Sequence, residues 1–169
     1  MKKAIIIGHN AKDKGAYSPI LKLHEFDFFS SMEKDLADLG TVYYHNPLIS
    51  SYTGRMLNTA QRINRYDYDI VLAMHFNMFD GTAHGCEALY FHTNHFGKHI
   101  SDRFCSAMHE NTGIRNRGAK PLRYPNQRGY YEVAFPTSTT LILEPFFGDN
   151  QDDCNRFNAD TFLHIIQHL

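Results

Sequence analysis

The sequence lacks the features that identify membrane, disulfide-rich and nucleic-acid-binding proteins. No apolar run approaches the roughly 20 residues that a bilayer-spanning helix needs. The 3 cysteines are far apart and form no CxxC pair, which argues against a disulfide framework and against a cysteine-based zinc site. The 17 basic and 18 acidic residues give a formal net charge of -1, so the overall charge provides no attraction for nucleic acid or for an anionic membrane.

Sequence features of several other classes of protein are also missing. The 169 residues contain no internal repeat, no low-complexity stretch and no long Pro/Gly/Ser linker, so we expect one domain over residues 1–169. Neither a GxSxG elbow nor a phosphate-binding glycine loop is present, and serine hydrolase and nucleotide-binding functions have no support. The apolar stretch AIII after MKK ends at GHN, which is too short for a signal peptide. We therefore expect synthesis as a soluble cytoplasmic protein.

Apolar segments of strand and helix type alternate along the chain. Strands are predicted at 4–8, 41–45, 70–74, 87–92 and 139–143. Helices are predicted from Glu25 to Gly40, at 54–65 with Leu57 and Ala60 facing inward, before Gly113, and at the C-terminus. The segment 111–136 has little periodicity and indicates a long loop with one edge strand. This alternation predicts a single α/β domain in which helices cover both faces of a mixed, mostly parallel sheet.

Three of the predicted strands end in a residue that can bind metal or transfer protons. The strand at 4–8 is followed by His9, the strand at 70–74 by His75, and the strand at 139–143 by Glu144. If these strands are parallel neighbours, the three side chains meet at one edge of the sheet, where α/β proteins place their functional sites. Glu25 lies on the buried face of the first helix, where a carboxylate is costly unless it is paired or bound to metal.

Two histidines and one carboxylate are a common ligand set for catalytic zinc, and a further glutamate can serve as general base. Other histidines fit this scheme less well. His24 points about 100° away from its neighbour Glu25 on a helix, so both cannot easily reach one metal ion. His84 lies in a predicted loop, where solvation is the simpler interpretation. Surface positions account for six others, namely His92, His95, His99, His109, His164 and His168.

The order of these segments resembles that of the zinc-dependent N-acetylmuramoyl-L-alanine amidases of the amidase-3 type. The shared features are IGH at 7–9, a glutamate opening the first helix, an Arg, an Asn and an Asp ahead of AMHFN at 73–77, GIRNRGAK at 113–120 and LEPFFGDN at 143–150. The Arg, Asn and Asp are Arg62, Asn64 and Asp69. Two departures are Asn10 and Phe146, which stand where the family has glycine, and a changed pocket would show there.

The resemblance implies that His9, Glu25 and His75 bind one zinc ion and that Glu144 is the catalytic carboxylate. It implies cleavage of the amide between N-acetylmuramic acid and L-alanine of peptidoglycan, with a zinc-activated water as nucleophile. We expect a monomer that binds no nucleic acid and acts at the cell wall or periplasm. A phage lysis enzyme released through a breached membrane fits this expectation, and export by another protein or a bacterial cytoplasmic role in recycling wall fragments would leave the same sequence.

Two other functions remain open on the sequence. A zinc peptidase would use the same metal chemistry on a different bond, and a cell-wall-binding module would have lost catalysis, although retention of Glu25 and Glu144 counts against the latter. Four further residues are without an assigned role. Glu87 can pair with a nearby arginine or take part in chemistry, Glu132 can face the cleft but receives no role from the resemblance, and Arg115 and Arg117 either steer an acidic stem peptide or are solvated.

Overall fold

Eight strands and seven helices alternate along the chain in the computed structural model, which describes residues 1–169. The strands are β1 (Lys3–Ile7), β2 (Tyr17–Ser18), β3 (Leu23–His24), β4 (Thr41–Tyr44), β5 (Ile70–Met74), β6 (Cys86–Phe91), β7 (Asn116–Leu122) and β8 (Thr139–Glu144). The helices are α1 (Glu25–Ser31), α2 (Glu33–Leu39), α3 (Tyr52–Ile63), α4 (His95–Thr112), α5 (Tyr130–Ala134), α6 (Gln151–Arg156) and α7 (Ala159–Gln167).

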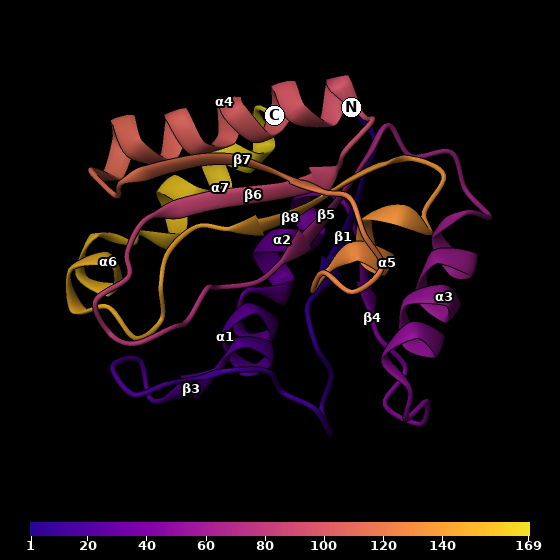
Figure 1. Ribbon diagram of the computed structural model, residues 1–169, viewed down its shortest axis with the longest axis horizontal. Helices are drawn as coiled ribbons and strands as arrows, with labels where there is room; N and C mark the ends of the chain where they lie inside the picture. The colour runs from indigo at the N-terminus through magenta and orange to yellow at the C-terminus, as the bar shows by residue number, and fades with distance from the viewer.

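Six of the strands form one sheet in the order β4-β1-β5-β8-β6-β7 (Figure 1). The pairs β4–β1, β1–β5, β5–β8 and β6–β7 are parallel, whereas β8–β6 is antiparallel. The short strands β2 and β3 form a separate antiparallel pair ahead of α1. The predicted mixed, mostly parallel sheet is confirmed.

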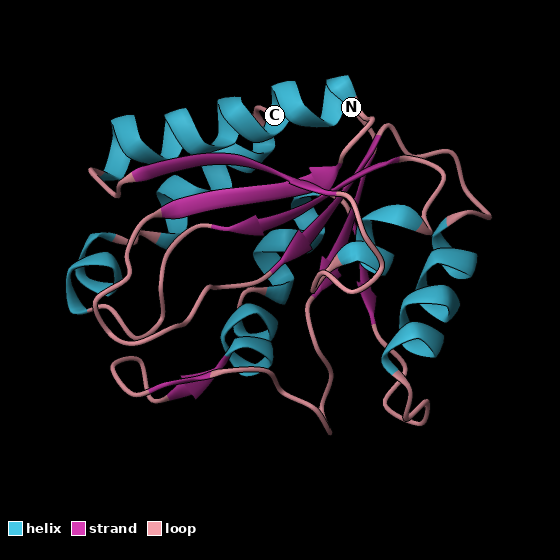
Figure 2. Cartoon of the chain, viewed as in Figure 1, coloured by secondary structure: helices cyan, strands magenta, loops and turns pink.

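Alternate residues of the central strands build a core on each face of the sheet. In β1, Ile5 and Ile7 belong to a large cluster with residues of α1, α2, α4 and α7. Ala4 and Ile6 belong to a smaller cluster with residues of α3 and α5. This follows from the two-residue period of a strand, which sends successive side chains to opposite faces. Helices therefore cover both faces, as Figure 2 shows by the cyan ribbons on either side of the magenta strands.

Three local predictions differ from the structure. The helix predicted from Glu25 to Gly40 is two helices that meet at Met32, and the hydroxyl of Ser31 donates to the carbonyl of Phe28, a local bond that competes with helix geometry. Leu57 is 44% exposed, because Met56 instead faces the core. The segment predicted as a long loop holds α5 as well as the edge strand β7.

The topology places the ends of β1, β5 and β8 side by side. These three strands are adjacent and parallel, so their carboxyl ends lie at one edge of the sheet, and the first residue of α1 lies close to that edge (Figure 1). None of the helices combines the length and the apolar composition that a membrane crossing needs.

Candidate active site

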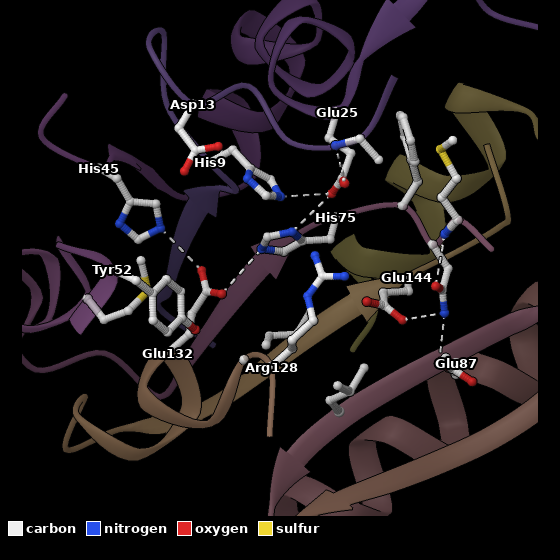
Figure 3. A pocket seen from close by; sticks show the side chains of 18 of the residues that line it. His9, Asp13, Glu25, His45, Tyr52, His75, Glu87, Arg128, Glu132 and Glu144 are labelled. Carbon is white, nitrogen blue, oxygen red and sulfur yellow. Dashed lines mark hydrogen bonds and ion pairs between the residues drawn. The ribbon is translucent and has the colours of Figure 1, made fainter. Parts of the chain in front are cut away.

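A cavity of about 800 Å³ opens at the carboxyl edge of the sheet. It is lined by the four residues singled out from the sequence, His9, Glu25, His75 and Glu144. Figure 3 shows their side chains directed into this space, with Arg128 between His75 and Glu144 and with Glu132 on the other side of His75. The predicted convergence of the strand ends is therefore confirmed.

The two histidines are brought close together by glycines that lack a side chain. His75 follows β5 directly, and a Cβ on Gly8 would lie 2.4 Å from its Cε1 atom. His9 has a φ of 63°, in the left-handed region, and a Cβ on Gly15 would lie 2.5 Å from its Cδ2 atom. A non-glycine residue with this φ is strained, and such strain is concentrated at functional sites. Gly8 and Gly15 are therefore part of what positions the imidazoles.

Glu25 joins the two imidazoles from the start of α1. It is 3% exposed, and its Oε1 atom accepts a hydrogen bond of 3.0 Å from the backbone N–H of Ala16. Its Oε2 atom lies 3.3 Å from His9 Nε2 and 3.1 Å from His75 Nδ1. Burial raises the pKa of a carboxyl group, but the contacts with His75 and His9 outweigh burial and lower the pKa of Glu25 to about 2.

The donor atoms of these three residues lie close enough together to hold one metal ion. One atom from each of His9, Glu25 and His75 lies within 4.8 Å of the others, and the group can hold a metal ion. Zinc bonds of about 2.0–2.2 Å in tetrahedral geometry place ligand atoms roughly 3.3–3.6 Å apart. The observed separations of 3.3 Å and 3.1 Å from the shared carboxylate oxygen differ from that range by only a few tenths of an ångström. Imidazole nitrogen and carboxylate oxygen are also the donors that zinc takes in catalytic sites.

Glu144 lies outside this group, at the other end of the same cavity. It ends β8, opposite Glu87 of the antiparallel strand β6. The amide of Asn77 donates 2.8 Å hydrogen bonds to both carboxylates, to Glu144 Oε2 and to Glu87 Oε1. Burial raises the pKa of Glu144 to about 8, and the facing carboxylate of Glu87 contributes in the same direction. Glu144 therefore titrates close to neutral pH.

Glu87 forms an ion pair with Arg117. Pairing with a nearby arginine was one of the two roles that the sequence left open for Glu87. The Arg117 Nε atom donates to Glu87 Oε2 at 2.7 Å, and the guanidinium lies over the ring of Phe147 with 5.0 Å to its centroid. Arg115 is exposed and lines a separate polar pocket with His84. Arg117 is thus paired with Glu87, and Arg115 lies outside the cavity that His9, Glu25 and His75 line.

Glu132, which the sequence allowed to face the cleft without giving it a role, lines the cavity beside His75. Glu132, on α5, is 4% exposed, with Oε2 3.2 Å from His75 Nε2 and Oε1 3.2 Å from His45 Nε2. Burial raises the pKa of Glu132, but these contacts with His75 and His45 lower it on balance. The contacts with Glu132 and Glu25 raise the pKa of His75 well above its ordinary value despite burial, which acts in the opposite direction.

The remaining histidines lie outside the group formed by His9, Glu25 and His75. His24 bonds through Nδ1 to the carbonyl oxygen of Gly15 and does not belong to the donor group. His84 is exposed, as predicted for a loop residue. Most of the others are exposed as well, with His92 half-buried. His45 differs from all of these because it is 2% exposed, and the sequence pattern gave no sign of its burial beside Glu132.

Comparison with known proteins gives a family and several similar structures. The sequence model of the family described as N-acetylmuramoyl-L-alanine amidase matches residues 4–168. Comparison with curated protein sequences gives no significant match. The catalytic domain of the CD27L endolysin, described as targeting Clostridia difficile, has a TM-score of 0.80 at 22% identity, covering 98% of this chain and 94% of that one.

Two bacterial amidases have the same fold. An N-acetylmuramoyl-L-alanine amidase from Clostridium difficile 630 has a TM-score of 0.78 at 19% identity, and the alignment covers 99% of this chain and 92% of that one. The catalytic domain of CwlV, an N-acetylmuramoyl-L-alanine amidase from Bacillus (Paenibacillus) polymyxa var. colistinus, has a TM-score of 0.66 at 22% identity, covering 99% of this chain and 93% of that one. At these identities the structural likeness establishes the fold.

Proposed function

The chain belongs to the N-acetylmuramoyl-L-alanine amidase family, and from this premise we propose that it hydrolyses the muramoyl-L-alanine amide of peptidoglycan with one zinc ion and Glu144 as general base. The family makes it a hydrolase that acts on the cell wall. The zinc ion, the ligand set and the role of Glu144 are the proposed parts. One observation supports them together, which is that the metal-binding group and a carboxyl group with a raised pKa line the same cavity.

The proposed metal ligands are His9, Glu25 and His75. Glu25 is held in place by the N–H of Ala16 through its other oxygen, so its Oε2 atom remains directed at the two imidazoles. When bound, zinc polarises a carbonyl group as a Lewis acid and lowers the pKa of water toward about 7. The protein contributes a fixed three-atom cradle that leaves a further coordination position for water or substrate.

Glu144 is proposed to take a proton from the attacking water and to give it to the leaving amine of L-alanine. A pKa near the working pH suits a group that must both accept and donate a proton. Asn77 restrains the carboxylate through its hydrogen bond to Glu144 Oε2, which leaves Oε1 available for proton transfer. These contacts support Glu144 as the base and then the acid of the same reaction.

Arg128 is the residue we propose to meet the acidic stem peptide. The cavity lining is rich in carboxylates, and its two arginines differ. Arg55 is paired with Asp13 at 2.7 Å, whereas Arg128 forms no ion pair and its side chain lies in the middle of the cavity in Figure 3. An unpaired guanidinium is suited to bind a carboxylate through two parallel hydrogen bonds.

Digestion of purified peptidoglycan tests the proposed reaction. The protein is incubated with peptidoglycan alone, with a chelator, and with a chelator followed by zinc. We expect new free amino ends of L-alanine on the first sample, none on the second and recovery on the third. New reducing sugar ends would indicate a glycosidase, and amino ends of other residues would indicate a peptidase, and either result would contradict the proposal.

The biological setting is a further part of the proposal. We propose that residues 1–169 are one monomeric catalytic domain that reaches the wall during phage lysis, which is supported by the fold that it shares with an endolysin catalytic domain. Expression in a susceptible host with and without a membrane-permeabilising protein tests this. Lysis is expected only when the membrane is breached, and lysis without any breach would contradict it.

A further inference from the structure

A buried chain of polar contacts extends from the metal-binding group into the fold. It runs from Glu25 to His75, then to Glu132, then to His45, and ends at Thr59 (Figure 3 shows the contacts as far as His45). The last contact joins His45 Nδ1 and Thr59 Oγ1 at 2.8 Å. The three residues beyond His75 come from three separate parts of the fold: Glu132 from α5, His45 from the position directly after β4, and Thr59 from α3.

The burial of these linked polar side chains is energetically costly and needs an explanation. Glu132, His45 and Thr59 are 4%, 2% and 1% exposed, so none of them is solvated as a surface residue would be. A buried carboxylate is costly unless positive charge and hydrogen-bond donors surround it. Glu132 has no lysine or arginine partner, and both of its contacts are imidazoles. A metal ion on His75 would place positive charge on the opposite side of that ring.

The two nitrogens of His75 face different partners. Nδ1 lies 3.1 Å from Glu25 Oε2, inside the metal-binding group. Nε2 is buried without a hydrogen bond of good geometry, and Glu132 Oε2, at 3.2 Å, is the acceptor next to it. A histidine that binds a metal through one nitrogen carries its proton on the other, and a carboxylate at that second nitrogen fixes the ring and makes it a better ligand.

We propose that Glu132 is a positioning residue for the metal ligand His75, and that His45 and Thr59 hold Glu132 in place. Glu132 keeps the proton of His75 on Nε2, so that the lone pair of Nδ1 points toward Glu25 and the metal. His45 donates through Nε2 to Glu132 and accepts at Nδ1 from the hydroxyl of Thr59, which fixes the orientation of the carboxylate. This inference rests on the proposed metal site but concerns residues to which the family resemblance gives no role.

Zinc affinity, measured by competition with a chromogenic chelator, tests the proposal without any substrate. The variants are Glu132→Ala, Glu132→Gln and His45→Gln. We expect Glu132→Ala to weaken zinc binding by about 10–100-fold, the usual effect of losing a carboxylate behind a metal-binding histidine. Glu132→Gln should recover part of this loss, because an amide oxygen can still accept from His75 Nε2. His45→Gln should weaken binding in the same direction by a smaller factor.

Asp13→Asn is the matched control, since it removes one negative charge from the same cavity without contacting His75. Equal losses of affinity in Asp13→Asn and Glu132→Ala would show a general charge effect and overturn the proposal. Unchanged affinity in both Glu132 variants would overturn it as well. Thermal unfolding of the metal-free variants checks folding, and if Glu132→Ala does not fold, Glu132→Gln and His45→Gln carry the test.

The absorption spectrum of the Co²⁺-loaded protein adds a readout that a merely structural role would not change. We expect the visible bands to shift in Glu132→Gln while the coordination number is retained. A loss of zinc affinity in Glu132→Gln as large as that from replacing Glu25 would identify Glu132 as a direct ligand and overturn the positioning role. Failure of the wild-type protein to bind zinc would contradict the proposed function itself, so the two failures are distinguishable.

Discussion

The two ends of the cavity use the same side chain in opposite ways. At the end with the proposed metal ligands, which we call the metal end, Glu25 and Glu132 alternate with histidines. The pKa values of both carboxyl groups are lowered. At the other end, Glu144 faces Glu87 across an antiparallel strand pair, and its pKa is raised to about 8. The difference lies in the neighbours and not in burial alone, because Glu25 and Glu132 are buried and have lowered pKa values, whereas the half-buried Glu144 has a raised one. Under the proposed function, one end keeps negative charge to hold a cation, and the other keeps a carboxyl group that exchanges a proton.

Replacement of Glu25 should have the largest effect on the metal end. In Glu25→Ala the oxygen shared by His9 and His75 is lost, and with it one of the three metal donors. We expect zinc affinity to fall by more than about 100-fold, beyond the effect of losing a residue that only contacts a ligand. Hydrolysis of peptidoglycan should be lost at micromolar zinc. Retention of one tightly bound zinc per chain would mean that the metal is held elsewhere.

Replacement of Glu144 should affect the rate and leave the metal in place. Glu144→Gln keeps the shape of the side chain and an acceptor for Asn77 but cannot take a proton. We expect kcat to fall by about 10²–10⁴-fold, the usual contribution of a general acid–base group. Zinc content should remain one ion per chain. Full activity in this variant would remove Glu144 from the mechanism, and loss of zinc would place Glu144 among the ligands.

The raised pKa of Glu144 predicts a pH dependence of the stability of the metal-free protein. A carboxyl group with a folded-state pKa above its unfolded-state value contributes stability that is present at low pH and lost as pH rises through the folded-state pKa. For Glu144 this loss falls between about pH 5 and pH 9. Other groups titrate in the same range, so the informative quantity is the difference between wild type and Glu144→Gln.

We expect the free energy of unfolding of the wild type to decline relative to Glu144→Gln as the pH rises over that window, and the difference to level off above it. Denaturant unfolding in the presence of a chelator, at intervals of one pH unit, measures this difference. Parallel curves for the two proteins would show that Glu144 has an ordinary pKa in the folded state.

Replacement of Glu87 should have the smallest effect of these substitutions. Glu87→Gln removes the carboxylate that faces Glu144 and contributes, after burial, to its raised pKa. The acid limb of the pH profile of kcat/KM should therefore move to lower pH, with only a few-fold change in kcat at the optimum. A limb that stays in place, with zinc content unchanged, would show that burial alone sets the pKa of Glu144.

Four of the cavity residues could be predicted from local features of the sequence. His9, His75 and Glu144 follow apolar strands, and the rule that parallel strands end at one sheet edge brings them together. Glu25 was found because a carboxylate on the apolar face of a helix is unusual. Each of these features involves residues that are close together in the sequence, so the sequence pattern alone reveals it.

The rest depends on contacts between distant segments. His45 and Glu132 are separated by 87 positions, and Glu132 lies in a segment with little periodicity, so no spacing connects them. Glu87 and Glu144 face each other through the β6–β8 register, which is antiparallel in a largely parallel sheet. The break at Met32 and the inward side chain of Met56 were missed because apolar spacing alone does not fix helix phase or a local Ser–backbone bond.

Anomalous diffraction at the zinc edge, from crystals of Glu144→Gln grown with zinc, tests the division of the cavity most directly. The account predicts one peak, within bonding distance of His9 Nε2, Glu25 Oε2 and His75 Nδ1, with Glu132 at His75 Nε2 and outside bonding distance. A peak bonded to Glu132 and His45, or one located between position 144 and Glu87, would contradict it.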